Sequence, residues 1–297
     1  MIARDKFDDF HPGIQFLFFF AAVVGSMCLL HPAFVLCAVL FSAAYVYLLR
    51  GRRAWRVFRI VLVMFTVISL LNPLLNTNGE QVLFTWLGGR PFYLESLLYG
   101  MTLGGMSVAV ILWFAAYNSV MTSDKFLHLF GRAVPSLSLV LTMILRLIPN
   151  YQRKAKQIAG ARQCIGMAGA GSLKEQLSGG AAVLSSLTSW ALEGGIERAD
   201  SMRCRGFGTG PRSHFSVYRW QGMDKGLLAG MLLLLAAVVV CAFRGATAWA
   251  FVPRLELAPL SQAVTALALA AYAAFLAIPV ILNIAEMIQW RSLRSKI

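Results

Sequence analysis

Long apolar runs constrain this chain more than any other feature, because a helix of about 20 apolar residues crosses the core of a bilayer. Hydrophobic residues make up 58% of the 297 positions and charged residues only 13%, which leaves too little polar surface for a soluble globule. The sequence therefore predicts an all-α integral membrane protein. Six spans are expected, at residues 14–30, 33–49, 58–75, 94–121, 226–243 and 260–281.

A further apolar run, residues 137–148, is too short to cross a bilayer alone. We expect it to lie along the inner face or to pack on the bundle. The first run follows Asp5, Asp8 and Asp9 and lacks a small-residue cleavage site, so no cleaved signal peptide is expected.

The positions of the cations predict the topology, because positively charged loops stay in the cytoplasm. Of the 27 Lys and Arg residues, 24 lie before the first run, in residues 50–59, in residues 118–225 or after residue 290. We expect a multi-pass protein of the cell membrane with both termini in the cytoplasm. The net charge of +14 then reflects topology and contact with anionic lipid headgroups, and nucleic-acid binding is not expected.

Three parts follow from this topology. Residues 1–135 form an N-terminal bundle of four spans, residues 136–220 a cytoplasmic helical region, and residues 221–297 a C-terminal pair of spans. The cytoplasmic region is expected to hold two long helices, one from Asn150 to Gly166 and one from about Gly180 to Arg205.

Small residues on both cytoplasmic helices predict a close crossing, since small side chains let two backbones approach. The alternative is that the helices only cap the bundle. The small residues are Ala155 and Ala159 on the first helix and Ala191, Gly195 and Ala199 on the second.

The second of these helices ends in an exposed arginine. Gly206 can supply the left-handed residue that ends a helix, and Arg205 is favoured there by the helix dipole while remaining free to bind a carboxylate. Two other interpretations stay open: Arg205 caps carbonyls of its own helix, or it reaches a lipid phosphate.

Several further residues have structural roles in this interpretation. Pro73 ends or kinks the third span, and Asn72 satisfies freed backbone groups. Gly79 belongs to the turn signals of an outer hairpin built on the strand-like residues 81–87. Arg146 lies beside Pro149 near the inner interface and is expected to anchor there.

The sequence offers no catalytic or metal-binding constellation. The five cysteines and four histidines lack metal-ligand spacing, and no phosphate-binding loop is present. We therefore expect no catalytic residue, no metal site and no cofactor bound by this chain.

Five short motifs, taken in order, resemble the transmembrane T component of energy-coupling factor transporters, a family that includes the cobalt-transport Q subunits. The resemblance extends over roughly residues 7–219. The motifs are NPLLNTNGEQVLF at 72–84, ESLLYGM at 95–101, NSVMTSDKFLHLFGR at 118–132, RLIP at 146–149 and MRCRGFG at 202–208.

This resemblance implies a non-enzymatic scaffold. It would link two cytoplasmic ABC-type ATPases, which hold the ATP and magnesium, to a membrane S component that binds a vitamin or a transition-metal ion. In the family, two coupling helices each end in an Ala-Arg-Gly-like tip that docks on one ATPase, and ATP-driven closure of the ATPase pair moves the helices.

Carried onto this chain, the second tip is Cys204, Arg205 and Gly206. The first tip is Cys164, Ile165 and Gly166, in which isoleucine replaces the arginine. Docking at the first tip would then rely on apolar contact or on Arg162, one helical turn earlier. We expect an asymmetric pairing, with two different ATPase subunits or with one weakened contact.

An alternative from another class is a stand-alone carrier or a lipid-handling membrane enzyme, which would need polar groups converging inside the bundle. The surface for an S component cannot be assigned from the sequence. Gly100, Gly104 and Gly105 form a flat face that suits either a second membrane protein or a neighbouring helix of the same bundle.

Overall fold

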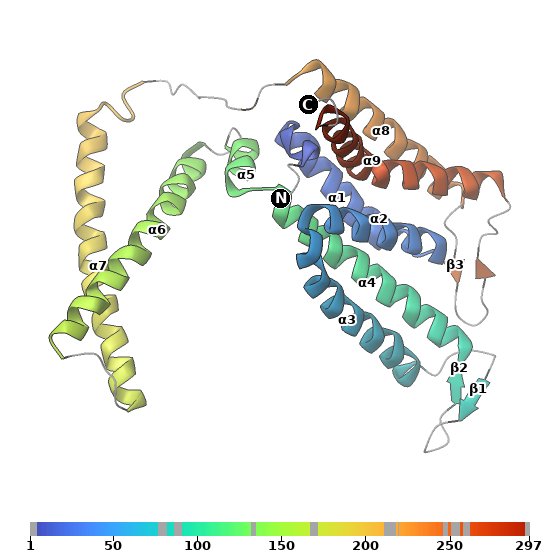
Figure 1. Ribbon diagram of the computed structural model, residues 1–297, viewed down its shortest axis with the longest axis horizontal. Helices are drawn as coiled ribbons and strands as arrows, with labels where there is room; N and C mark the ends of the chain where they lie inside the picture. The colour runs from blue at the N-terminus through green and yellow to red at the C-terminus, as the bar shows by residue number, and fades with distance from the viewer. Residues whose placement is uncertain are drawn as a thin grey trace. The chain divides into compact units, whose positions relative to one another are not determined.

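The computed structural model shows a helical protein and describes residues 5–76, 82–85, 91–131, 135–166, 172–210, 218, 220–245, 249–250, 256–257 and 262–294. The chain divides into two compact units (Figure 1). Unit 1 comprises Met1–Phe126 and Tyr218–Ile297, and unit 2 comprises Leu127–Val217.

Apolar helices make up most of unit 1. Among the described residues, four stretches are long and apolar enough to cross a membrane: Pro32–Leu75, Leu94–Val120, Gly222–Phe243 and Ala263–Trp290. The first of these contains two helices and the short turn between them. The helices of unit 1 are η1 (Lys6–Asp9), α1 (Pro12–Cys28), α2 (Pro32–Arg50), η2 (Gly51–Arg53), α3 (Ala54–Leu75), α4 (Leu94–Val120), α8 (Gly222–Phe243) and α9 (Ala263–Arg294). The protein is therefore membrane-embedded and all-α.

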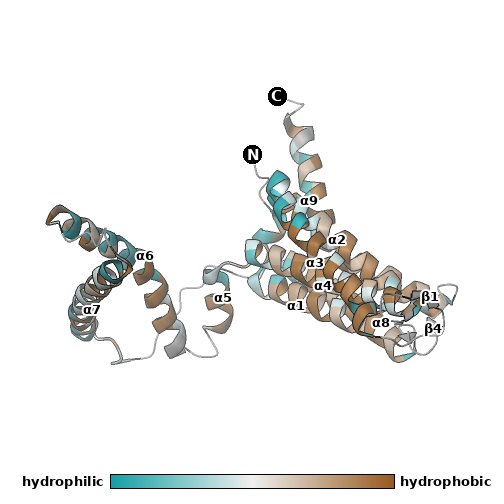
Figure 2. Cartoon of the chain, turned by 90° about the horizontal axis from the view of Figure 1, so that it is seen from below, coloured by the Kyte–Doolittle hydropathy of each residue, from teal (hydrophilic) through white to brown (hydrophobic). Residues whose placement is uncertain are grey.

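Unit 2 contains the two long helices α6 (Pro135–Cys164) and α7 (Leu173–Cys204), in the region that the sequence predicts to be cytoplasmic. The chain enters unit 2 within the short helix α5 (Ser123–Phe130). Figure 2 shows mostly hydrophobic residues along the helices of unit 1 and a larger share of hydrophilic residues on α6 and α7.

Two helices of unit 1 begin with the same dipeptide. His11 and His31 occupy the N-cap positions of α1 and α2, and a proline follows each at the first helical position. The Nδ1 atom of each histidine accepts a hydrogen bond from the backbone N–H two residues later. Proline suits this position because the first N–H groups of a helix have no intrahelical partner.

An aromatic cluster forms the core of unit 1. Trp113 of α4 is fully buried and meets Phe18 of α1 edge to face, with ring centroids 5.5 Å apart. Phe18 also stacks on Phe275 of α9 at 5.1 Å. Such ring pairs stabilise the core beyond the burial of their area, so α1, α4 and α9 are joined at one place.

The glycines of α4 pack against helices of the same unit. A Cβ atom on Gly100 would lie 2.8 Å from the carbonyl oxygen of Ser69 in α3, and one on Gly105 would lie 2.8 Å from Val35 in α2. Neither distance is sterically possible, so these positions allow α3 and α2 to approach α4 closely. This packing favours contact with neighbouring helices of the same bundle over contact with a second membrane protein.

Two of the expected element boundaries, and one of the two roles expected for Pro73, differ in the structure. Residues 137–148 are not a separate segment, because α6 continues without a break from Pro135 to Cys164 and contains Pro149. The second long helix begins at Leu173 rather than near residue 180. Pro73 does not end α3, which continues to Leu75, and the Asn76 N–H donates to the Asn72 carbonyl at 2.8 Å.

The predicted hairpin is confirmed, while its position at the outer membrane face stays a prediction. Strands β1 (Val82–Thr85) and β2 (Pro91–Tyr93) pair antiparallel with Val82 opposite Tyr93. Gly79 lies outside the described residues. A second, unpredicted pair joins β3 (Trp249–Ala250) to β4 (Glu256–Leu257).

Candidate functional site

Helices α6 and α7 of unit 2 pack together around a tryptophan. The Trp190 ring of α7 meets Tyr151 of α6 edge to face, with centroids 5.6 Å apart. The Lys154 ammonium lies 5.4 Å from the centre of the same ring, within the range of a cation–π interaction. Trp190 is therefore the main anchor of α7 on α6.

Only part of the predicted small-residue crossing lies on this covered face. Ala155, Ala159 and Ala191 are partly buried, whereas Gly195 and Ala199 are exposed. Gly194 and Arg198 replace them on the covered face, since they share a helical stripe with Trp190 at spacings of four. The indole ring buries more area than glycine or alanine can, which explains why it sets the rotation of α7.

The end of α7 is a Schellman motif. Gly206 has φ +77°, its N–H donates to the Arg203 carbonyl at 2.9 Å, and the Phe207 N–H donates to the Met202 carbonyl at 3.1 Å. These are the two bonds that define the motif. Thr209 Oγ1 donates to the Gly206 carbonyl at 2.7 Å, so the residues after the helix are held as well.

The end of α6 shares two of these features, the left-handed glycine and the bond from its N–H. Gly166 also has φ +77°, and its N–H donates to the Gln163 carbonyl at 3.1 Å. Ile165 therefore occupies the position that corresponds to Arg205, the residue before the left-handed glycine. The Ile165 side chain is 67% exposed, so its apolar surface is available at the end of α6.

The cationic residues of unit 2 differ in exposure. Arg205 and Arg146 are exposed and Arg162 is partly buried. Across the described ranges, the Arg205 guanidinium has no hydrogen bond and no ion pair, so it does not cap the carbonyls of α7. Cys164 and Cys204, which precede the two tip residues, are exposed free thiols.

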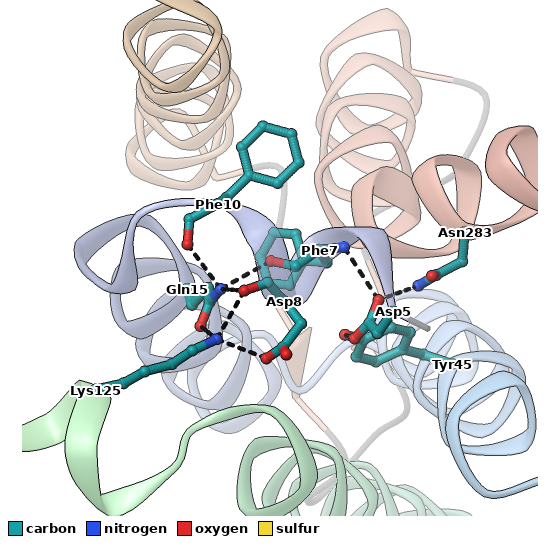
Figure 3. Close-up of polar contacts among 8 residues, drawn as sticks. All are labelled: Asp5, Phe7, Asp8, Phe10, Gln15, Tyr45, Lys125 and Asn283. Atoms are coloured by element: carbon teal, nitrogen blue, oxygen red, sulfur yellow. Dashed lines mark hydrogen bonds and ion pairs between the residues drawn. The ribbon is translucent and has the colours of Figure 1, made fainter. Parts of the chain in front are cut away.

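A second cluster of polar residues, in unit 1, was not predicted. Gln15 of α1 is completely buried, and its Nε2 lies 2.8 Å from the Phe7 carbonyl, 3.0 Å from that of Asp8 and 2.9 Å from that of Phe10 (Figure 3). An amide group has two protons for these three acceptors, so at least one bond is shared. The Gln15 amide thus satisfies the carbonyls at the end of η1.

Lys125 of α5 completes the cluster. Its ammonium donates to the Asp8 carbonyl at 2.8 Å and to Gln15 Oε1 at 2.9 Å, and it forms an ion pair with the Asp8 carboxylate. The Lys125 side chain is 5% exposed and that of Asp8 45%. The charge of the buried lysine is therefore balanced by a carboxylate that stays in contact with solvent.

Asp5 ties the same segment to two spans. Its carboxylate accepts from the Tyr45 hydroxyl of α2 at 2.8 Å and from the Asn283 amide of α9 at 2.6 Å (Figure 3). Burial raises the pKa of the Asp5 carboxyl above its ordinary value, against the opposing effect of the hydrogen bonds from Tyr45 and Asn283.

The start of α8 contacts this segment too. The Trp220 ring stacks on His11 with centroids 4.1 Å apart, and the His11 N–H donates to the buried Asp224 carboxylate at 3.4 Å. Asp224 also accepts from the Gln221 N–H as part of a capping box. We call the residues that make these contacts, Asp5, Asp8, His11 and Gln15, the N-terminal anchor.

The N-terminal anchor holds both segments through which the chain passes between the units. Lys125 lies just before the passage at Phe126, and Trp220 lies just after the return at Tyr218. A glutamine inside an apolar run was the available sequence signal, because a buried amide must find partners. Its partner Lys125 is 110 positions away, which no local pattern reports.

The chain was compared with known proteins. No protein-family model matches it, and no curated protein matches it. Within the described residues, no group of three or more His, Cys, Asp or Glu side chains is placed to hold a metal ion. The helix tips and the N-terminal anchor are therefore the features of this chain that bear on its function.

Proposed function

We propose that this protein is the transmembrane coupling subunit of an ATP-driven importer of the energy-coupling factor type. It binds two cytoplasmic ABC-type ATPases through the ends of α6 and α7, and it carries their movement to a membrane S component that binds a vitamin or a transition-metal ion. ATP and magnesium are held by the ATPases. The proposal includes six spans and places the protein in the cell membrane with both termini in the cytoplasm.

The observation that carries this proposal is the repeated geometry of the two tips. Both helices end with an exposed residue followed by a glycine at φ +77°. A glycine in this conformation stops the helix abruptly and leaves the preceding side chain projecting at the end. Two helix ends in one unit that share a projecting residue before a left-handed glycine suit two related grooves, one on each ATPase of a pair.

The difference between the tips supports an unequal pair of contacts. Arg205 offers a guanidinium for a carboxylate, whereas Ile165 offers only apolar area. Burial of an isoleucine side chain contributes about 1.5–3 kcal/mol, and a desolvated charge pair contributes a similar or larger amount. We therefore expect a heterodimeric ATPase pair, in which the groove for α6 is apolar and the groove for α7 is acidic.

The N-terminal anchor fits this role. In a coupling subunit, the segments that join unit 2 to the spans must keep their position on unit 1 when unit 2 moves. Lys125 and His11 fix the two connecting segments through directional contacts. The charged hydrogen bond of Lys125 contributes about 1.5–3 kcal/mol, and the ring contact of His11 about 0.5–1.5 kcal/mol.

The test is a pull-down in mild detergent, scored for ABC ATPase subunits. We compare the wild type with Arg205→Glu and with the matched control Arg203→Glu, an exposed charge reversal in the last turn of the same helix. We expect the wild type to retain an ATPase pair, Arg205→Glu to lose at least one subunit, and Arg203→Glu to keep both.

Two results would contradict the proposal. If the wild type retains no ATPase, the stand-alone carrier or lipid-handling enzyme becomes the better interpretation. If Arg203→Glu and Arg205→Glu lose the ATPases equally, the charge of the helix end matters and the projecting position of Arg205 does not.

A further inference from the structure

The turn between α2 and α3 carries five arginines and no acidic residue in the ten positions 50–59, RGRRAWRVFR. Gly51 has φ +53° and allows the abrupt change of direction from α2 into η2. Neither the helix tips nor the N-terminal anchor uses these residues. Their contacts divide them into two classes.

Arg50 is bound within the protein. Its Nη2 donates to the Ala115 carbonyl of α4 at 2.8 Å and to Ser119 Oγ at 3.0 Å, and its Nε donates to the same hydroxyl at 3.1 Å. Arg50 thus joins the end of α2 to the last turns of α4. Its donors are already directed at protein acceptors.

The other four arginines have no such partners. Arg52, Arg53, Arg56 and Arg59 are all exposed, and within the part of the chain that the structure describes none of their guanidinium groups forms a hydrogen bond or an ion pair. Trp55 lies among them with 68% of its surface exposed. Four unpaired guanidinium groups around an exposed indole form a surface that suits a negatively charged partner.

The position of this surface along α3 identifies the partner. Trp55 and Arg59 lie on the same face of α3 as Leu62, Val63 and Leu70, which are large, exposed and apolar. From Arg59 to Leu62 the helix rises only about 4.5 Å. The charged surface therefore continues directly into the apolar face of a candidate span.

A bilayer has the same order of chemistry over the same distance, with phosphates above acyl chains. Tryptophan is enriched at this level because its ring is amphipathic, and arginine can extend to the headgroups while its stem stays in apolar surroundings. An acidic protein that bound the arginines would not also require the apolar face of α3 that begins at Leu62.

We propose that Arg52, Arg53, Arg56 and Arg59, together with Trp55, bind the phosphate of an anionic phospholipid such as phosphatidylglycerol. The site uses the forked donors of arginine, which match a phosphate in two-point contacts. The proposal depends on the membrane embedding of the protein and is independent of whether the chain couples to ATPases.

The experiment measures lipid selectivity with the full chain in nanodiscs of phosphatidylcholine. A spin-labelled phosphatidylglycerol competes with phosphatidylcholine for the protein surface. We compare the wild type with Arg53→Gln/Arg56→Gln, with the charge-preserving Arg53→Lys/Arg56→Lys, and with Arg50→Gln as the matched control from the same turn. Glycerol phosphate in solution tests for a site that takes any free phosphate ester.

We expect Arg53→Gln/Arg56→Gln to lower the preference for phosphatidylglycerol at least tenfold, because each basic residue at the surface contributes roughly fivefold. Arg53→Lys/Arg56→Lys, which keeps charge and topology, should lose part of the preference. Arg50→Gln should keep it, and glycerol phosphate should not compete.

Several outcomes would overturn the proposal. An equal loss in Arg50→Gln would show general charge attraction and no site. Full preference in Arg53→Gln/Arg56→Gln would show that these arginines do not bind lipid. Loss of a bound protein partner in that variant, with lipid preference unchanged, would assign the surface to protein, and effective competition by glycerol phosphate would assign it to a soluble ligand.

Discussion

Removing either partner of the ion pair between Lys125 and Asp8 should lower the free energy of unfolding, by unequal amounts. In Lys125→Met the apolar stem is kept and the ammonium is lost. The Asp8 carboxylate is 45% exposed and can be hydrated again, and the Asp8 carbonyl keeps its bond from Gln15. The Oε1 of Gln15, in a fully buried side chain, loses the donor at 2.9 Å. One unsatisfied buried acceptor costs about 1–3 kcal/mol, so we expect Lys125→Met to lower the free energy of unfolding by about 2 kcal/mol.

Removing the charge of Asp8 should lower the free energy of unfolding more than removing the charge of Lys125. Asp8→Asn leaves an ammonium that is 95% buried without its counterion, and breaking a buried pair in this way costs about 3–5 kcal/mol. Because Asp8 is half-exposed, solvent screening reduces this value, and we expect about 3 kcal/mol. The residue that solvent reaches is therefore the more costly one to change.

The assay is unfolding of the purified protein in mild detergent titrated with dodecyl sulfate, followed by helical circular dichroism. Lys156→Met is the control, because Lys156 is an exposed lysine of α6 and its loss should change the free energy by less than about 0.5 kcal/mol. Equal values for Lys125→Met and Lys156→Met would refute the reasoning. A smaller cost for Asp8→Asn than for Lys125→Met would show that the buried ammonium does not need its counterion.

Three further predictions follow from other parts of the structure. Because burial raises the pKa of Asp5, its contribution to stability is present below the ordinary value of 3.8 and is lost as the pH rises through the raised value. The melting temperature of Asp5→Asn should therefore rise relative to that of the wild type between about pH 4 and pH 8. A difference in melting temperature that does not change with pH would contradict this. Gly100→Ala places a Cβ 2.8 Å from the Ser69 carbonyl and should cost about 1–3 kcal/mol, whereas Gly230→Ala, with no described atom within 4 Å, should be neutral or slightly stabilising in the same dodecyl sulfate titration. Ile165→Arg should change the retention of one ATPase in the pull-down, and an unchanged ratio of the two ATPases would show that the difference between the tips is unimportant.

The apolar helices of unit 1 could be predicted because the length of an apolar run is itself the physical requirement for a span. The hairpin of β1 and β2 could be predicted because turn residues flank a strand-like segment. The sequence predicted an apolar run at residues 137–148 and a separate helix from Asn150, whereas the structure has one helix through Pro149, since a proline favours a helix boundary but does not force one.

The long-range contacts could not be predicted. The small residues Ala191, Gly195 and Ala199 repeat every fourth position, yet Trp190 sets the covered face of α7, because contact area outweighs close approach at this crossing. The network of Gln15 and Lys125 depends on residues far apart in the chain. Sequence patterns report which residues share a face, and they do not report which partner that face meets.

The position of the N-terminal anchor explains why polar contacts hold the connecting segments. The covalent chain passes between the units at only two places, within α5 and before Tyr218. Apolar contacts resist separation but allow sliding, since their energy depends on area and has no direction. Hydrogen bonds such as those of Lys125 are lost when the donor moves by about an ångström. In the proposed coupling role, fixed donors at both passages would transmit a displacement of unit 2 to η1 and α1, where apolar contacts alone would let the connecting segments slip.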